Sequence, residues 1–192
     1  MPADIPITRE VETRAMEGLR RDFLAVPTVN AYFHGNILVG PLLDNDEIVQ
    51  PPQINLSLLP GDVYDAGMGG VTRDQIPLMM KVYFPAELKA FKIGGTNPHS
   101  VVSVLIRIIT RGSIDPYTDE PNGNGYILDP DWNATPPLVS PADPLRWINT
   151  HTYGCTKQAA LMVPMDKPRY MLIPVAISLE TKLDPITRQR VA

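Results

Sequence analysis

Proline is the feature that most constrains the fold of this chain, because it occurs 21 times in 192 residues. That is roughly twice its average usage. Proline removes a backbone donor and breaks helix interiors, so an all-helical bundle is excluded. Hydrophobic residues make up 44% of the chain, which is too many for a disordered protein. We therefore expect one α+β domain over residues 1–192 with long ordered loops.

Residues 112–146, called the arm below, combine proline with negative charge. They hold seven of the prolines, and 112–145 contains six acidic residues and no Lys or Arg. Residues 146–192 hold seven bases and three acids. One interpretation is two separate solvated surfaces. The other is an acidic arm and a basic surface that meet across a subunit boundary, since complementary fields fix orientation.

Aromatic residues within the arm favour docking, because disordered linkers are poor in them. A loop of this length is either functional or disordered. We expect the interaction residues to come from the arm, the basic C-terminal part and the first helix: Tyr117, Tyr126, Asp129, Asp131, Trp132, Arg146, Trp147, Arg169, Arg20 and Arg21.

Hydrophobic periodicity predicts two helices. In residues 8–25 an apolar stripe recurs every four residues, Thr8 is placed to cap the helix, and Pro27 ends it. Residues 97–110 begin with a capping Asn97 before a proline and should be buried against a sheet. A buried strand is the competing interpretation of 97–110, because its β-branched content is high.

Alternating patterns predict a mainly antiparallel sheet of about four to five strands with both helices packed on it. Pro174 should place the last strand at an edge or a bulge. We expect a flexible loop over 60–74 and a polar tail over 182–192. The predicted strands cover residues 36–39, 53–59, 75–84, 156–163 and 169–181.

Composition also bounds the class of function. The net charge of −4 and pI of about 5.3 argue against general nucleic-acid affinity. Cys155 is the only cysteine, so no internal disulfide can form. The first residues lack the basic and apolar regions of a signal peptide, and no apolar run reaches the roughly 20 residues of a membrane span.

Four motifs are candidates for chemistry, and each has an ordinary structural alternative. His151 and Cys155 fall short of the three or four ligands that zinc requires. The sequence from Asp129 to Asn133 resembles the start of a calcium loop but lacks the glycine and glutamate of an EF-hand. Residues 67–70 lack the Gly-Lys-Ser/Thr of a phosphate loop. Adjacent His99 and Ser100 point apart on a helix. We therefore expect no cofactor, no metal and no enzymatic activity.

The order of elements resembles the bacteriophage tail-terminator, or neck, protein family. The resemblance is one of order and character over about two-thirds of the chain, without a diagnostic motif, and it carries over no catalytic residue. The matching segments are Arg9–Leu24, Pro52–Leu59, Gln75–Phe84, Asn97–Ile109, Lys157–Val163 and Arg169–Leu179.

The resemblance implies a structural virion protein that is assembled in the host cytoplasm. In this family six copies form a ring at the head-proximal end of the tail, end tube growth and join the tail to the neck. The implied partners are other copies and the tail-tube protein, with sheath and head-side connector proteins as further candidates. It implies no membrane partner and no specific nucleic-acid binding, although DNA passes through such a ring. Alternatives are another neck, collar or head-completion protein, or a monomeric protein-binding module.

Overall fold

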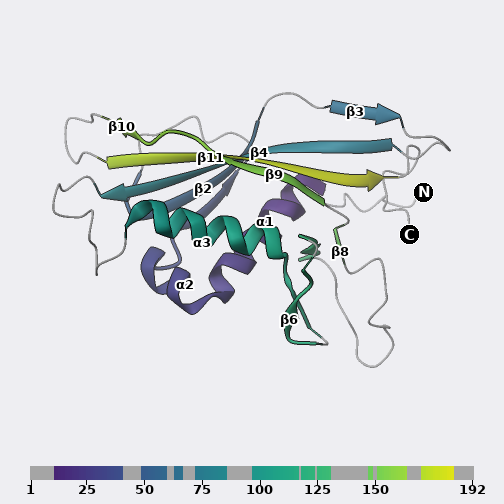
Figure 1. The fold of residues 1–192 in the computed structure, drawn as a ribbon, viewed down its shortest axis with the longest axis horizontal. Helices are drawn as coiled ribbons and strands as arrows, with labels where there is room; N and C mark the ends of the chain where they lie inside the picture. Colours follow the sequence, from purple (N-terminus) through teal and green to yellow (C-terminus); the bar gives the residue numbers. More distant parts are fainter. Residues whose placement is uncertain are drawn as a thin grey trace, which may run out of the picture.

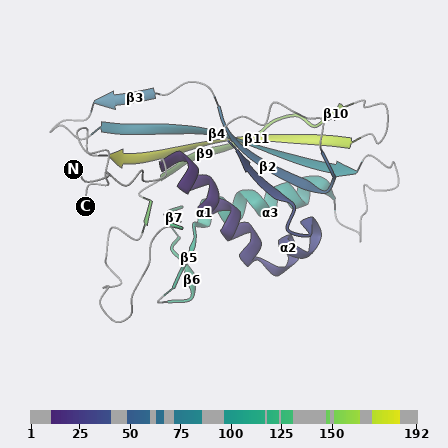
Figure 2. The ribbon, with the colours of Figure 1, turned by 180° about the vertical axis from the view of Figure 1, so that it is seen from behind.

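The computed structural model describes residues 11–40, 49–59, 63–66, 72–85, 97–116, 118–123, 125–130, 147–148, 151–163 and 170–183. Seven strands in this part of the chain form one sheet, and three helices pack on the same side of it (Figures 1 and 2). The fold is therefore α+β, as the sequence predicts. The predicted Thr8 cap and most of the predicted polar tail lie outside the described residues.

The sheet is built around two long antiparallel strands, β4 and β11, which pair along 14 residues each. The order is β1-β2-β4-β11-β10, with β3 also on β4 and β9 also on β11. Only the β1–β2 pair is parallel among the described strands. The strands are β1 (Ile37–Gly40), β2 (Gln53–Leu58), β3 (Val63–Ala66), β4 (Thr72–Pro85), β9 (His151–Lys157), β10 (Leu161–Val163) and β11 (Tyr170–Leu183).

The helices are α1 (Val11–Ala25), α2 (Pro27–Phe33) and α3 (Pro98–Arg111). The first and third match the predicted helices, and the Asn97 side chain accepts a hydrogen bond from the His99 backbone N–H at 2.9 Å. The prediction misses α2. Pro27 does follow the end of α1, but it stands in the first turn of α2, where its fixed φ suits a helix and its missing donor costs nothing.

The core lies between the helices and the sheet. Alternate residues of the central strands are buried there, including Ile54, Leu56, Leu78, Met80 and Val82. The apolar stripe of α1 and the buried side of α3 cover them, with Leu19, Phe23, Val102 and Leu105 at or below 1% exposure. Fully burying one such side chain contributes about 1.5–3 kcal/mol to the free energy of unfolding. This layer of side chains therefore accounts for most of the packing between helices and sheet.

Part of the opposite sheet face is buried as well. Tyr83 and Tyr170 pack there edge to face with ring centroids 5.2 Å apart. Next to them, Gln53 and Asn55 are buried and joined by a 2.6 Å hydrogen bond from Gln53 Nε2 to Asn55 Oδ1. The polar residues of β2 are therefore not a solvated face, although they alternate with apolar ones as in a half-exposed strand.

Several predicted boundaries are wrong. The expected loop over 60–74 contains strand β3, which pairs with residues 72–75 of β4. The expected strand over 156–163 is two strands, β9 and β10, separated by residues 158–160. Strand β11 continues to Leu183, into the expected polar tail.

Pro174 lies in the centre of the sheet, so the predicted edge position is wrong, and the register shift in the β9–β11 ladder lies between Ser178 and Leu179, not at Pro174. It pairs with Lys81 of β4, while its carbonyl accepts a 2.9 Å hydrogen bond from the Gln158 N–H on the other side. The N–H and C=O of a strand residue point the same way, so the missing donor of Pro174 faces the break between β9 and β10. The pairing of β11 with β9 and β10 is therefore already interrupted at the point where Pro174 cannot donate a hydrogen bond.

Candidate functional site

The described part of the arm folds back onto helix α1 of its own chain. Residues 112–130 contribute to two short ladders that project on the helix side of the sheet (Figure 2). One pairs β5 (Ile114–Asp115) with β6 (Glu120–Pro121). The other pairs β7 (Ile127–Leu128) with β8 (Trp147–Ile148). The arm is thus held close to the body at both ends, because β8 immediately follows it.

Glycine at position 18 allows the arm to approach α1 closely. A Cβ on Gly18 would overlap the Cγ2 of Ile127 and would lie 3.1 Å from the Leu128 carbonyl oxygen. Ile127 is 1% exposed, so this contact is part of the core. Glycine weakens a helix interior by about 1 kcal/mol relative to alanine, and here it makes room for the arm.

Two arginines of α1 fasten the same segment. Arg14 Nη1 donates to Asp129 Oδ2 at 2.7 Å, and Asp129 is 5% exposed. Arg21 Nη2 donates to the Leu128 carbonyl at 2.8 Å and lies 3.4 Å from Asp22 Oδ1. Breaking a buried ion pair from one side typically costs about 3–5 kcal/mol. Arg14 and Arg21 therefore bind the arm, and Arg21 is one of the residues that the sequence analysis expects to interact.

Ser113 joins the start of the arm to its end and to α1. Its hydroxyl forms a short hydrogen bond with Asp22 Oδ2 and accepts the Leu128 N–H at 2.9 Å. Burial raises the pKa of Asp22 to about 6, although Ser113 and Arg21 oppose this rise by hydrogen bonding and charge. The side chain of Asp22 therefore gains a proton in mildly acidic solution, where it can donate to Ser113.

Asn122 shapes the turn between the two ladders. Its amide donates to the carbonyls of Ser113 and Tyr126 at 3.0 and 2.7 Å. Gly112 has a φ of +79°, and a Cβ there would overlap Asn122 and Tyr126. The Gly123 N–H donates to the Arg111 carbonyl at 2.9 Å and so satisfies the end of α3.

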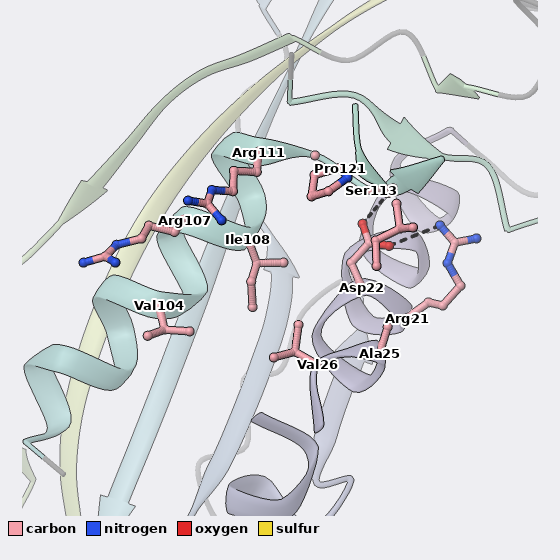
Figure 3. A pocket seen from close by; sticks show the side chains of 12 residues that line it. Arg21, Asp22, Ala25, Val26, Val104, Arg107, Ile108, Arg111, Ser113 and Pro121 are labelled. Carbon is pink, nitrogen blue, oxygen red and sulfur yellow. Dashed lines mark hydrogen bonds and ion pairs between the residues drawn. The ribbon is translucent and has the colours of Figure 1, made fainter. Parts of the chain in front are cut away.

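A groove of about 390 Å³ lies beside this junction, between the C-terminal halves of α1 and α3. Its apolar walls come from Ala25, Val26, Val104, Ile108, Ile114 and Pro121. Ile108 of α3 and Val26, the residue between α1 and α2, point toward one another across it (Figure 3). Asp22 and Ser113 close one end, while Arg107 and Arg111 line the α3 side. This groove is the candidate binding site in the described part of the chain.

The structure brings together only part of the predicted interaction set. Asp129 and Arg21 belong to the arm junction, Tyr126 is half-buried in the Asn122 turn, and Arg20 is exposed on α1. Trp147 pairs with Leu128 in the β7–β8 ladder. The remaining predictions lie outside the described residues: Tyr117, Asp131, Trp132, Arg146 and Arg169.

The prediction misses Gly18, Asp22, Ser113, Arg107 and Arg111. A glycine inside an otherwise strong helix pattern indicates a close approach and is the available clue to Gly18. Asp22 and Ser113 are 91 residues apart in the sequence, and no local pattern joins them. Arg107 and Arg111 recur on one side of α3 but are inconspicuous among its many apolar residues.

Residues 67–70 and residues 131–133 of the calcium-like sequence lie outside the described residues. Within the described residues, no three His, Cys, Asp or Glu side chains come together to hold a metal ion. Asp129, the first residue of the calcium-like sequence, is paired with Arg14. Burial raises the pKa of the Cys155 thiol to about 11, which disfavours the thiolate. None of the described helices is long and apolar enough to cross a membrane.

No protein-family model matches the chain. No curated protein matches it either. Among solved structures it is similar to a chain in the virion of a native gene transfer agent particle, with 9% sequence identity and a TM-score of 0.47. The alignment covers 91% of this chain and 99% of that one.

Proposed function

We propose that this protein is a structural virion component that forms a ring at the head-proximal end of a phage tail. In this role it ends tube growth and joins the tail to the neck. The observation that carries the proposal is the arrangement of elements: α1 and α3 pack on one side of a mainly antiparallel sheet that closes with the β10–β11 hairpin. This is the order and character in which the sequence resembles the tail-terminator family.

Surface chemistry supports a head-to-tail ring. Such a ring uses heterologous contacts, in which one patch meets a different patch on the next copy. The exposed β5–β6 hairpin carries Asp119 and Glu120, while α3 carries Arg107 and Arg111 and no acidic residue. A single copy therefore presents patches of opposite charge, which favour directional contacts between identical subunits.

Native mass measurement of the purified chain, alone and with the cognate tail-tube protein, tests the ring. We expect one closed stoichiometry, six by family resemblance, in at least one of the two conditions. A monomer in both conditions contradicts the proposal. Another neck, collar or head-completion protein would also form a ring but would bind the connector instead of the tube.

The groove favours a second candidate, a monomeric protein-binding module. It is apolar, has charged residues at its margins and has the volume of a small-ligand or side-chain site. On this alternative the chain stays monomeric and binds a partner peptide with one-to-one stoichiometry. The same native mass measurement therefore separates the two candidates.

A further inference from the structure

We propose that the groove between α1 and α3 receives the arm segment 131–146 of a neighbouring copy of this chain. This inference rests on the proposed ring and names the contact that would hold neighbouring subunits together. The occupant lies outside the described residues, so it is characterised by its sequence chemistry and by the two points between which it runs.

The groove is suited to an apolar anchor. Val104 is 38% exposed and Ile114 is 44% exposed, so apolar side chains of the groove remain in contact with solvent. A second hollow of about 210 Å³ shares Val104 and continues between α2 and α3, past Tyr32 and Val101. The two hollows together form an extended apolar surface along α3, which fits an extended segment better than a compact ligand.

The charge at the margin favours a carboxylate in the occupant. Three arginines line the groove, Arg21, Arg107 and Arg111, against one carboxylate, Asp22, which is already hydrogen-bonded to Ser113. Arg107 and Arg111 are exposed and belong to α3, which contains no Asp or Glu. An apolar side chain next to a carboxylate would fill the hollow and bring that carboxylate to one of these two guanidinium groups, which bind carboxylates with two parallel hydrogen bonds.

Segment 131–146 has this chemistry. It begins with Asp131-Trp132, continues through Leu138 and Val139 to Asp143, and contains no base before Arg146. Its four prolines reduce the conformational entropy lost when an extended segment binds. Trp132 is the largest apolar side chain available to fill a groove, and tryptophan is typical of binding hot spots.

The residues on both sides of segment 131–146 are anchored on the body of the chain, so the segment between them can extend to a neighbouring copy. Asp129 is fixed on Arg14, and Trp147 pairs with Leu128, so both ends leave the body side by side. Sixteen residues span at most about 55 Å when extended, so the tip of an out-and-back loop reaches about half of that. Groove and segment are different patches, as a heterologous ring requires.

Mixing two full-length variants tests the contact in trans. The groove variant carries Val104→Glu and Arg107→Glu, both at exposed positions that should not disturb folding. The arm variant carries Asp131→Lys and Trp132→Ala. Each alone should remain monomeric by native mass measurement. An equimolar mixture should give a one-to-one heterodimer, because one intact arm then meets one intact groove.

A matched control is Thr110→Glu, which adds a negative charge at an exposed position of α3 that does not line the groove. It should assemble like the unmodified chain. Assembly of either double variant at the level of the unmodified chain would overturn the inference while leaving the ring intact. A mixture that stays monomeric would overturn it as well.

A peptide measurement separates failure of this inference from failure of the ring. A dye-labelled synthetic peptide of residues 129–146 is titrated with the full-length arm variant, and the fluorescence anisotropy of the dye is followed. We expect saturable binding. The affinity should fall at least tenfold when Val104→Glu and Arg107→Glu are added to the arm variant. Absence of binding overturns the inference, whatever the oligomeric state of the unmodified chain.

Discussion

Gly18 of α1 and Ile127 of the arm are in such close contact that no side chain fits between them. A glycine-to-alanine substitution in the interior of an exposed helix typically stabilises a protein by about 1 kcal/mol. Here the added methyl group overlaps Ile127, so we expect a loss of about 1–3 kcal/mol in the free energy of unfolding. Urea unfolding followed by circular dichroism measures it.

The matched control adds Gly18→Ala to an Ile127→Ala background. Removal of the Ile127 Cγ2 removes the overlap but leaves the Leu128 carbonyl oxygen 3.1 Å from the new Cβ, so the second substitution should cost clearly less than in the unmodified background. An equal loss in both backgrounds would show that the Gly18–Ile127 contact is not the cause.

Breaking the Arg14–Asp129 pair should also release the arm. Arg14→Met leaves Asp129 buried beside an apolar side chain, and we expect a loss of about 3 kcal/mol. A double-mutant cycle with Asp129→Asn gives the coupling energy, which should exceed about 1 kcal/mol. Arg20→Met, at an exposed position of the same helix, should change stability by no more than about 0.5 kcal/mol. Additive single-site effects would contradict the pairing.

Asp22 should make stability depend on pH. Its pKa rises from the ordinary value of 3.8 to about 6 in the folded chain, mainly through burial. The folded state therefore binds the proton more tightly than the unfolded state does. The resulting stabilisation is complete below about pH 4 and is lost as pH rises through about 6, and the difference in pKa corresponds to about 3 kcal/mol.

Asp22→Asn should abolish this contribution, so the difference in unfolding free energy between the two proteins should change between about pH 4 and 6. Other carboxylates cancel in that difference. A constant difference across this range would show that Asp22 is not the group concerned.

Cys155 should react slowly in the folded protein. It is partly buried on β9 and its pKa is raised to about 11, so little thiolate is present at neutral pH. Labelling with a disulfide reagent at about pH 7 should be at least tenfold slower than in urea. Equally fast labelling in both conditions would contradict the buried environment of the thiol.

The sequence predicts the elements whose periodicity is strong. The stripe of α1, the Asn97 cap of α3 and the alternating residues of β2 and β4 are recognisable because each pattern is local. The same local logic fails at two prolines. Pro27 indicates a helix end, although it also suits the first turn of α2. Pro174 indicates an edge or a bulge, because the break between β9 and β10 that accommodates it has no clear sequence signal.

The candidate site is largely hidden from the sequence because its contacts join distant segments. Asp22 meets Ser113 and Arg14 meets Asp129 across 91 and 115 residues. Composition reveals the acidic arm itself, but acidic residues alternate with the arginines of α1, so the sequence does not show which of these arginines binds the arm. Charge alternation along a helix does not distinguish exposure to water from contact with an acidic segment of the same chain.

Growth of tail tubes in the presence of this protein tests the central claim most directly. The cognate tube protein is polymerised alone and with increasing amounts of the chain, and tube length and tube ends are examined by electron microscopy. The account predicts shorter tubes with a ring of added density at one end only. Tubes of unchanged length with bare ends at saturating protein would contradict it.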